Sequence, residues 1–200
     1  MQVSQSPRSR RDHLILFARN FFNHPLMLGS LIPSSRYLIE HLLREVDWRR
    51  ARVIVEYGPG VGTFTAEILR RMRPDATLVV FETNDEFVQF LKTNFDDPRL
   101  HVEHGSAEEV GAVLERLGCG PADYMVSGIP FSTMPEELRD RILRATRSAL
   151  KPDGVLLVYQ FSGKVHPHLQ RVFPRVDRGF EPRNVLPAWI FYARQGARDH

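Results

Sequence analysis

The chain has 200 residues, of which 42% are hydrophobic and 26% are charged. This length fits one domain with a substantial core, and this composition excludes a largely disordered chain. The single cysteine, Cys119, excludes an internal disulfide, so we expect a partly buried thiol in a reducing cytoplasm. No apolar run approaches the roughly 20 residues that a membrane-spanning helix needs, so we expect neither an exported nor an integral membrane protein.

The formal net charge is +3, and the first 24 residues alone carry an excess of that size. Proteins that bind long nucleic acids usually spread basic charge over a whole face. The confinement of the excess to one arm indicates another partner, so we do not expect a nucleic acid. The basic residues of this arm are Arg8, Arg10, Arg11 and Arg19.

Two helices are predicted before the first strand. Apolar side chains recur at helical spacing over residues 13–24, with Phe17, Phe21 and Phe22 on or beside one face, and Pro25 ends the pattern. Pro33-Ser34-Ser35 predicts the start of a second helix that runs to about residue 47. We therefore divide the chain into a basic amphipathic segment at 1–48, a membrane-facing segment or substrate lid, and a main domain at 49–200.

Strands and helices alternate in the main domain. The expected strands are 52–57, 77–82, 100–103, 124–127 and 155–161, and the expected helices are 63–73, 85–95, 107–117 and 136–150. Continuously apolar strands in strict alternation with helices predict a parallel sheet covered on both faces. Two final strands, 175–181 and 185–193, have no helix between them and predict a closing antiparallel hairpin. The prediction is thus an α/β three-layer sandwich around a mainly parallel seven-stranded sheet.

A glycine-rich turn follows the first strand, where residues 53–62 read VIVEYGPGVG. Glycines at 58, 60 and 62 allow a sharp turn and a close approach of ligand to backbone. Glu82 ends the next strand, 20 residues after Gly62, where a carboxylate can accept ribose hydroxyls. Glu56 precedes the turn and would attract an ammonium or sulfonium group rather than a phosphate. A nicotinamide site and a purely structural turn are the alternatives.

The two carboxylates and the glycine spacing resemble those of class I methyltransferases, which have a Rossmann-like fold. That resemblance implies S-adenosylmethionine as cofactor and S-adenosylhomocysteine as product. It also implies that Ser106 stands where many such enzymes use an aspartate to hold adenine. The implied cofactor contacts are Glu56, Tyr57, Gly58, Gly60, Gly62, Thr63, Glu82, Thr83, Ser106, Ala107 and Ser127.

The fourth strand ends in SGIPF at residues 127–131. Because proline restricts the residue before it, Ile129 is expected to be extended and Phe131 to be presented at a fixed angle. Adenine-N6 methyltransferases have Asn or Asp, then Pro and an aromatic residue, at this point. The dimethylating ribosomal RNA enzymes have Asn where this chain has Gly128. The missing amide weakens a nucleobase interpretation, and the loop Ser127, Gly128, Ile129, Pro130 and Phe131 is expected to be a substrate pocket.

Over about 160 residues the chain resembles bacterial phospholipid N-methyltransferases, which use S-adenosylmethionine to convert phosphatidylethanolamine stepwise to phosphatidylcholine. Five motifs in order carry the resemblance: IPSSR at 32–36, EYGPGVGTFT at 56–65, SGIP at 127–130, YQF at 159–161 and NVLPA at 184–188. The pattern departs after Phe161, where the family often has Thr-Tyr-Gly-Pro and this chain has SGKV at 162–165. The implied activity is N-methylation of a phospholipid amine at the inner face of the cytoplasmic membrane.

Several side chains are candidates for positioning or deprotonating that amine. Tyr159 and Tyr37 are the preferred bases or orienters. His166 and His168 are lesser candidates, with a surface turn as their alternative role. Arg36 is a candidate for a lipid phosphate, with helix capping or solvation as its alternative role. The sequence positions no third ligand beside the two histidines, so no metal site is expected. Trp189 and Tyr192 on the closing hairpin are expected to be core residues.

The resemblance implies a role in membrane binding for the basic arm at residues 1–24. Its arginines and Phe17, Phe21 and Phe22 can hold the protein on an anionic phospholipid surface, or the aromatic rings can cap the domain core instead. Two rival functions remain open: an adenine-N6 methyltransferase acting on RNA, and a cofactor-binding module without catalysis. The head group, the number of methyl groups added and the oligomeric state are not predicted.

Overall fold

A computed structural model of the chain describes residues 34–196. The helix predicted at 13–24 lies outside the described residues. So do all the proposed membrane contacts of the arm: Arg8, Arg10, Arg11, Phe17, Arg19, Phe21 and Phe22. Within the described part, no helix combines the length and apolar character that crossing a membrane requires.

A seven-stranded sheet forms the centre of the molecule, with strand order β3-β2-β1-β4-β5-β7-β6. Strands β1 to β5 pair in parallel, and β7 runs antiparallel to both β5 and β6. The predicted sheet and its antiparallel C-terminal hairpin are therefore confirmed. The strands are Val53–Tyr57 (β1), Thr77–Glu82 (β2), Leu100–His104 (β3), Ala122–Ser127 (β4), Leu150–Gln160 (β5), Arg175–Glu181 (β6) and Ala188–Arg194 (β7).

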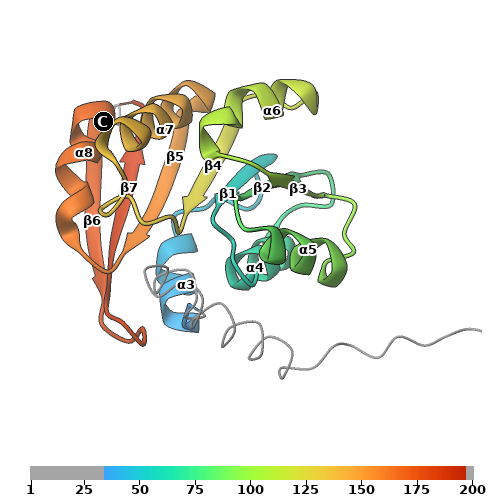
Figure 1. Cartoon of the computed structure of the whole chain (residues 1–200), viewed down its shortest axis with the longest axis horizontal. Helices are drawn as coiled ribbons and strands as arrows, with labels where there is room; N and C mark the ends of the chain where they lie inside the picture. Colours follow the sequence, from blue (N-terminus) through green and yellow to red (C-terminus); the bar gives the residue numbers. More distant parts are fainter. Residues whose placement is uncertain (1–33, 197–200) are drawn as a thin grey trace, which may run out of the picture.

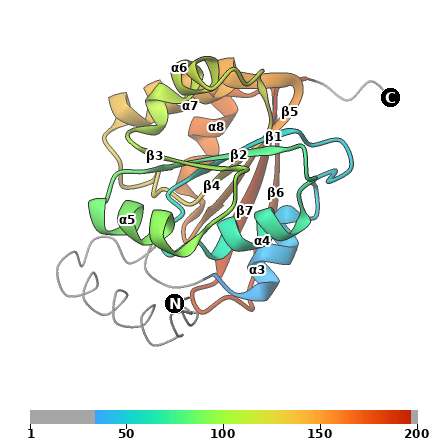
Figure 2. The same cartoon turned by 90° about the vertical axis from the view of Figure 1, so that its right-hand side faces the viewer.

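Helices cover both faces of this sheet, as the view along its edge makes visible (Figure 2). One face carries α3, α4 and α5, and the other carries α6, α7 and α8, so the three-layer sandwich is confirmed. The helices are Arg36–Leu43 (α3), Thr63–Arg71 (α4), Asp85–Asn94 (α5), Val110–Arg116 (α6), Glu136–Ala149 (α7) and His166–Val172 (α8), with short 3-10 turns at Ala107–Glu109 (η2) and Gly163–Val165 (η3).

Helix α8 was not predicted, and its first residues were considered a possible surface turn. Pro167 lies in the first turn of this helix, where a missing backbone N–H costs nothing. Val165, Leu169 and Phe173 recur every four residues and are all buried against the sheet. The helix is short and carries two histidines, which obscured this apolar spacing. Strand β5 also begins five residues earlier than predicted, at Leu150.

The start of α3 is held at the edge of the sheet where the parallel strands end. Asn184, in the tip of the β6–β7 hairpin, accepts a hydrogen bond from the Ser35 backbone N–H at 2.8 Å. Ser35 in turn caps α3 by accepting from the Leu38 N–H at 3.2 Å. One turn further along, the Tyr192 hydroxyl donates to the His41 carbonyl at 2.7 Å. Helix α3 is thus part of the main domain's packing, beside the hairpin (Figure 1).

Substituting Gly62 tests the turn that begins α4. Its φ of 77° disfavours any side chain, and an added Cβ would lie 2.6 Å from the Phe95 ring. We expect Gly62→Ala to lower the free energy of unfolding by about 2 kcal/mol, measured by denaturant titration.

The matched control is Gly111→Ala in α6, where an added Cβ meets nothing within 4 Å. This change should leave stability equal or raise it by up to about 1 kcal/mol. Equal losses from the two substitutions would contradict the conformation described for the turn.

Candidate active site

The glycine-rich turn lies directly against the loop that follows β4. Gly58 has a φ of 68°, and a Cβ on it would lie 2.8 Å from the Cγ2 atom of Ile129. Gly60 and Gly62 also have positive φ. Two motifs that are about 70 residues apart in sequence therefore form one wall at the carboxyl end of the sheet, where open α/β sheets bind their ligands.

Glu56 is a buried carboxylate beside this turn. Among the described residues its hydrogen-bond partner is the Thr65 hydroxyl, which donates to it at 2.7 Å, and no cationic side chain pairs with it. Burial raises the pKa of Glu56 to about 8; the Thr65 bond opposes the rise, and the nearby Glu82 adds to it. A carboxylate kept this far from water and from cations fits a positively charged ligand group.

Glu82 joins the end of β2 to the turn. Its carboxylate accepts from the backbone N–H groups of Gly60 at 3.2 Å, Thr83 at 2.8 Å and Asn84 at 3.0 Å. Burial raises the pKa of Glu82, and these three hydrogen bonds oppose the rise. The oxygen bonded to Gly60 has a second lone pair available, which suits a hydroxyl of a ribose.

The hydroxyl of Ser106, just after β3, already makes two hydrogen bonds within the protein. Its hydroxyl donates to the Glu108 carboxylate at 3.1 Å and accepts from the Glu108 N–H at 3.3 Å, which caps η2. Ala107 beside it is buried. A hydrogen bond from Ser106 to an adenine amine would have to replace the one to Glu108.

Two of the expected cofactor contacts point to the other face of the sheet. The Tyr57 ring lies in the core next to α7, with its hydroxyl 3.2 Å from the Thr146 hydroxyl, and only its carbonyl, which accepts from Gly128 N–H at 2.9 Å, faces this edge. Ser127 is fully buried between Tyr57 and Val158 in the sheet, and its hydroxyl has no partner in the described part of the chain. Thr63 begins α4, half-buried, and Thr83 is exposed.

A cavity of about 320 Å³ opens at the ends of β4 and β5; we call it the acceptor cavity. Of the predicted pocket residues, Gly128, Pro130 and Tyr159 line it, whereas Phe131 is fully buried in the core and Ile129 packs against the glycine turn. The complete lining is Gly128, Pro130, Ser132, Thr133, Tyr159, Gln160, Phe161, Ser162 and Lys164.

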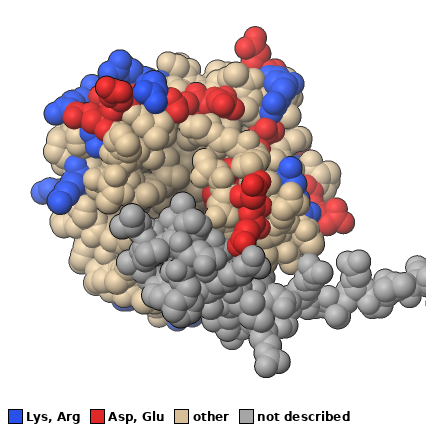
Figure 3. Space-filling model, viewed as in Figure 1, with Lys and Arg blue, Asp and Glu red and all other residues tan. Residues whose placement is uncertain are grey.

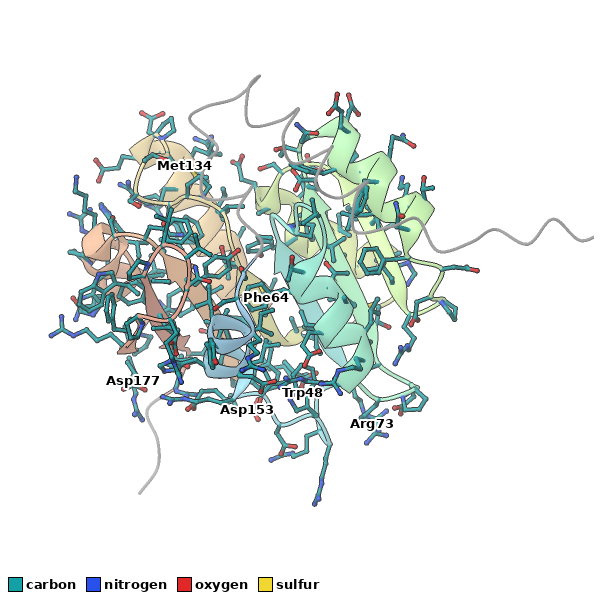
Figure 4. The ribbon with its side chains drawn as sticks, turned by 90° about the horizontal axis from the view of Figure 1, so that it is seen from below. Trp48, Phe64, Arg73, Met134, Asp153 and Asp177 are labelled. Carbon is teal, nitrogen blue, oxygen red and sulfur yellow. The ribbon has the colours of Figure 1, made fainter. Side chains whose placement is uncertain are left out.

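Tyr159 occupies the space that a side chain at position 128 would need. A Cβ on Gly128 would lie 2.5 Å from the Tyr159 hydroxyl oxygen. The Tyr159 ring stacks on Phe64 at 5.1 Å between ring centres, and Phe64 belongs to the first turn of α4 (Figure 4). Burial raises the pKa of Tyr159 to about 12, with a hydrogen bond to the Ser34 side chain opposing and Glu56 adding to the rise. The phenol therefore stays protonated at neutral pH.

Gln160 fixes the loop after β4, a role that the sequence analysis did not assign. Its amide donates to the carbonyls of Ile129 at 2.7 Å and Tyr159 at 2.9 Å, and accepts from the Ser132 hydroxyl at 3.1 Å. Thr65, the partner of Glu56, was missed in the same way. Both residues belong to motifs noted in the sequence, so the signal was present without its geometry.

Arg36 and Tyr37 lie outside the acceptor cavity. Arg36 donates to the Tyr37 hydroxyl at 2.8 Å, which lowers the pKa of that phenol, and the Arg183 guanidinium lies 4.3 Å from the Tyr37 ring centre. Tyr37 and Arg183 line a separate groove between α3 and the tip of the β6–β7 hairpin, and Arg36 lies beside it.

The two candidate histidines and the hairpin aromatics lie away from the acceptor cavity. His166 stacks on Phe191 at 5.6 Å, and burial lowers the pKa of His168, both on α8. Tyr192 is buried and Trp189 packs against the core, as expected. Cys119 is half-buried.

The residues at this edge fit S-adenosylmethionine. Gly58, Gly60 and Gly62 all have positive φ, which gives the turn a sharp backbone path that side chains would disfavour, and Cβ atoms on Gly58 and Gly62 would meet Ile129 and Phe95. Glu82 suits a ribose, and Glu56 suits the positively charged methionine end of the cofactor.

Glu56→Gln tests whether the buried carboxyl is protonated in the folded protein. The native group holds its proton up to about pH 8, whereas the unfolded chain releases it above its ordinary value of 4.5. Unfolding thus releases a proton between these pH values, and the free energy of unfolding should fall as pH rises, by at most about 1.4 kcal/mol per pH unit. Denaturant titrations from pH 5 to 8 should show this fall in the wild type relative to Glu56→Gln. Parallel pH profiles of the two proteins would contradict the assignment.

Comparison with known proteins agrees with this geometry. The profile of the family described as "Methyltransferase small domain" matches residues 29–181. An ornithine lipid N-methyltransferase from Singulisphaera acidiphila is 33% identical over 181 residues, which make up 90% of this chain and 94% of that protein.

Two solved structures share the fold. A precorrin 8w decarboxylase from Methanobacterium thermoautotrophicum has a TM-score of 0.62 at 18% identity, over 82% of this chain and 92% of its own. PigF with SAH has a TM-score of 0.60 at 16% identity, over 94% of this chain and 63% of its own. The chain belongs to the methyltransferase small domain family and is a class I methyltransferase that uses S-adenosylmethionine.

Proposed function

We propose that this protein methylates the amine of a lipid head group. The motifs favour phosphatidylethanolamine, and the name of the Singulisphaera relative adds ornithine lipid as a second head group. The observation that carries the proposal is the Tyr159 hydroxyl held against Gly128, because it places a single hydrogen-bonding group where base-methylating enzymes place an amide. One hydroxyl suits a small amine better than the edge of a planar base.

Two further features disfavour a nucleobase acceptor. Phe131, the ring that would stack on a base, is fully buried. On the face drawn in Figure 3, Lys and Arg side chains gather at the upper left, over α7 and α8, with acidic side chains among them. That face therefore lacks the continuous basic surface typical of RNA-binding proteins.

The acceptor cavity offers a way to hold a neutral amine. When bound, S-adenosylmethionine supplies an electrophilic methyl group. Tyr159, protonated up to a pKa of about 12, is not a base at neutral pH, but its hydroxyl oxygen can accept an N–H and direct the lone pair of the amine. The amine binds after it has lost its proton to water, so this arrangement needs no dedicated base.

The tip of the β6–β7 hairpin supports a membrane-facing orientation. The large hydrophobic side chains that are exposed in the described part of the chain lie here: Phe180 is 45% exposed, Val185 72% and Leu186 38%. Arg183 and Arg36 lie beside them and can meet lipid phosphates. The tip lies at the edge of the sheet that carries the acceptor cavity, so we propose peripheral attachment to the inner face of the cytoplasmic membrane, with the arm at residues 1–24 adding basic charge.

Transfer assays test the proposed acceptor. Labelled S-adenosylmethionine should pass its methyl group to liposomes containing phosphatidylethanolamine or ornithine lipid, and not to ribosomal RNA. Tyr159→Phe should reduce transfer to lipid by roughly 10-fold to 100-fold, because the amine loses its orienting hydroxyl. Label in RNA alone would overturn the proposal, and failure of the protein to bind S-adenosylmethionine in calorimetry would favour a module without catalysis.

Charge placed in the hairpin tip tests the orientation. The double variant Val185→Glu, Leu186→Glu should partition onto anionic liposomes at least about tenfold more weakly in flotation, because two apolar contacts are replaced by repelled charges. Ala112→Glu, exposed on α6 at the opposite end of the molecule, is the matched control and should bind as the wild type does. Equal binding by both variants would contradict a membrane-facing hairpin.

A further inference from the structure

The lining of the acceptor cavity includes one charged side chain, that of Lys164. It belongs to the segment where the sequence departs from the pattern of the phospholipid N-methyltransferases. Residues 162–165 read SGKV and follow β5 directly. Lys164 lines the cavity, is exposed, and makes no ion pair among the described residues. No acidic residue contributes to the lining. This end of the cavity therefore carries an unneutralised positive charge.

The residues on either side of Lys164 hold its backbone in place. Val165, next in the chain, is fully buried in the core, which anchors the η3 turn on the sheet. The Ser162 oxygen accepts from the backbone N–H of Lys164 at 3.4 Å, so its own O–H remains available to donate. The hydroxyls of Ser132 and Thr133 already donate to Gln160 and to the Pro130 carbonyl. Lys164 and Ser162 are thus, beside the Tyr159 hydroxyl, the side-chain donors of this lining that a further acceptor can use.

The cavity lining offers two different polar groups to a ligand. The Tyr159 hydroxyl can accept an N–H from an amine, and the Lys164 ammonium can pair with an anion. A ligand with a basic nitrogen at one end and an anionic group at the other matches this arrangement, whereas a simple cation would be repelled from the Lys164 side.

We propose that Lys164 and Ser162 form a subsite for the anionic group of a zwitterionic lipid head group whose amine is the methyl acceptor. This inference rests on the proposed function and adds how the acceptor is selected. The anion is a phosphate diester or a carboxylate, since an ammonium binds either as a point charge. The subsite acts on substrate binding, so its loss raises KM and leaves kcat nearly unchanged.

Steady-state kinetics in mixed micelles of an uncharged detergent test the subsite without a membrane contribution. The acceptors are phosphatidylethanolamine for the phosphate, ornithine lipid for the carboxylate, and octadecylamine, which has an amine and no anion. Lys164→Gln should raise KM about tenfold for whichever zwitterionic lipid the wild type methylates, with kcat within about twofold. It should leave octadecylamine unaffected or improve its KM, and Lys164→Arg should restore most of the affinity.

Lys92→Gln, an exposed lysine on α5, is the matched control and should change nothing. An unchanged KM in Lys164→Gln with an active wild type would overturn the subsite alone. Equal losses with octadecylamine and the zwitterionic lipids would also overturn it, because the anion would then be irrelevant. If the wild type methylated none of the three acceptors, the proposed function itself would fail, and the subsite with it.

Discussion

The contact between Gly128 and Tyr159 is the constraint on which the rest of the acceptor site depends. The backbone at the end of β4 approaches the phenol so closely that no Cβ fits between them. Three contacts support this approach. Phe64 stacks on the phenol ring, and Gln160 donates hydrogen bonds to the carbonyls of Ile129 and Tyr159. Gly58, which has no side chain, lets Ile129 pack directly against the glycine turn. Phe64 and Gly58 belong to the glycine-turn motif at 56–65 and Gln160 to the motif at 159–161, so three of the five dispersed motifs meet in one packed cluster.

Electrostatics divide the same edge of the sheet into two parts. Glu56 and Glu82 are buried on either side of the glycine turn, where burial disfavours their charge and a cationic cofactor would restore it. The acceptor cavity instead contains a protonated phenol and a lysine. The phenol oxygen can accept an N–H and direct the lone pair of a neutral amine. Positioning can therefore supply what a general base would otherwise supply.

The periodicity of apolar residues along the sequence was enough to predict the architecture. Runs of β-branched residues that alternate with helices leave few arrangements other than a parallel sheet covered on both faces. The periodicity did not reveal α8, whose Pro167 and flanking histidines hide a buried stripe. Tyr57 and Ser127 were predicted as cofactor contacts from their place in a motif, but alternation along a strand turns their side chains to the other face. The roles of Gln160 and of the bare Gly128 depend on neighbours about 30 residues away, and no local pattern specifies such contacts.

A double-mutant cycle between Gly128 and Tyr159 tests the central contact directly. Gly128→Ala should destabilise the wild type by about 2 kcal/mol in denaturant unfolding, because the methyl group meets the phenol hydroxyl. In the Tyr159→Phe background, which lacks that oxygen, the same substitution should cost markedly less, giving a coupling energy of about 1 kcal/mol. Equal costs in both backgrounds would contradict the account, because the Tyr159 hydroxyl would then not be the group that excludes a side chain at position 128.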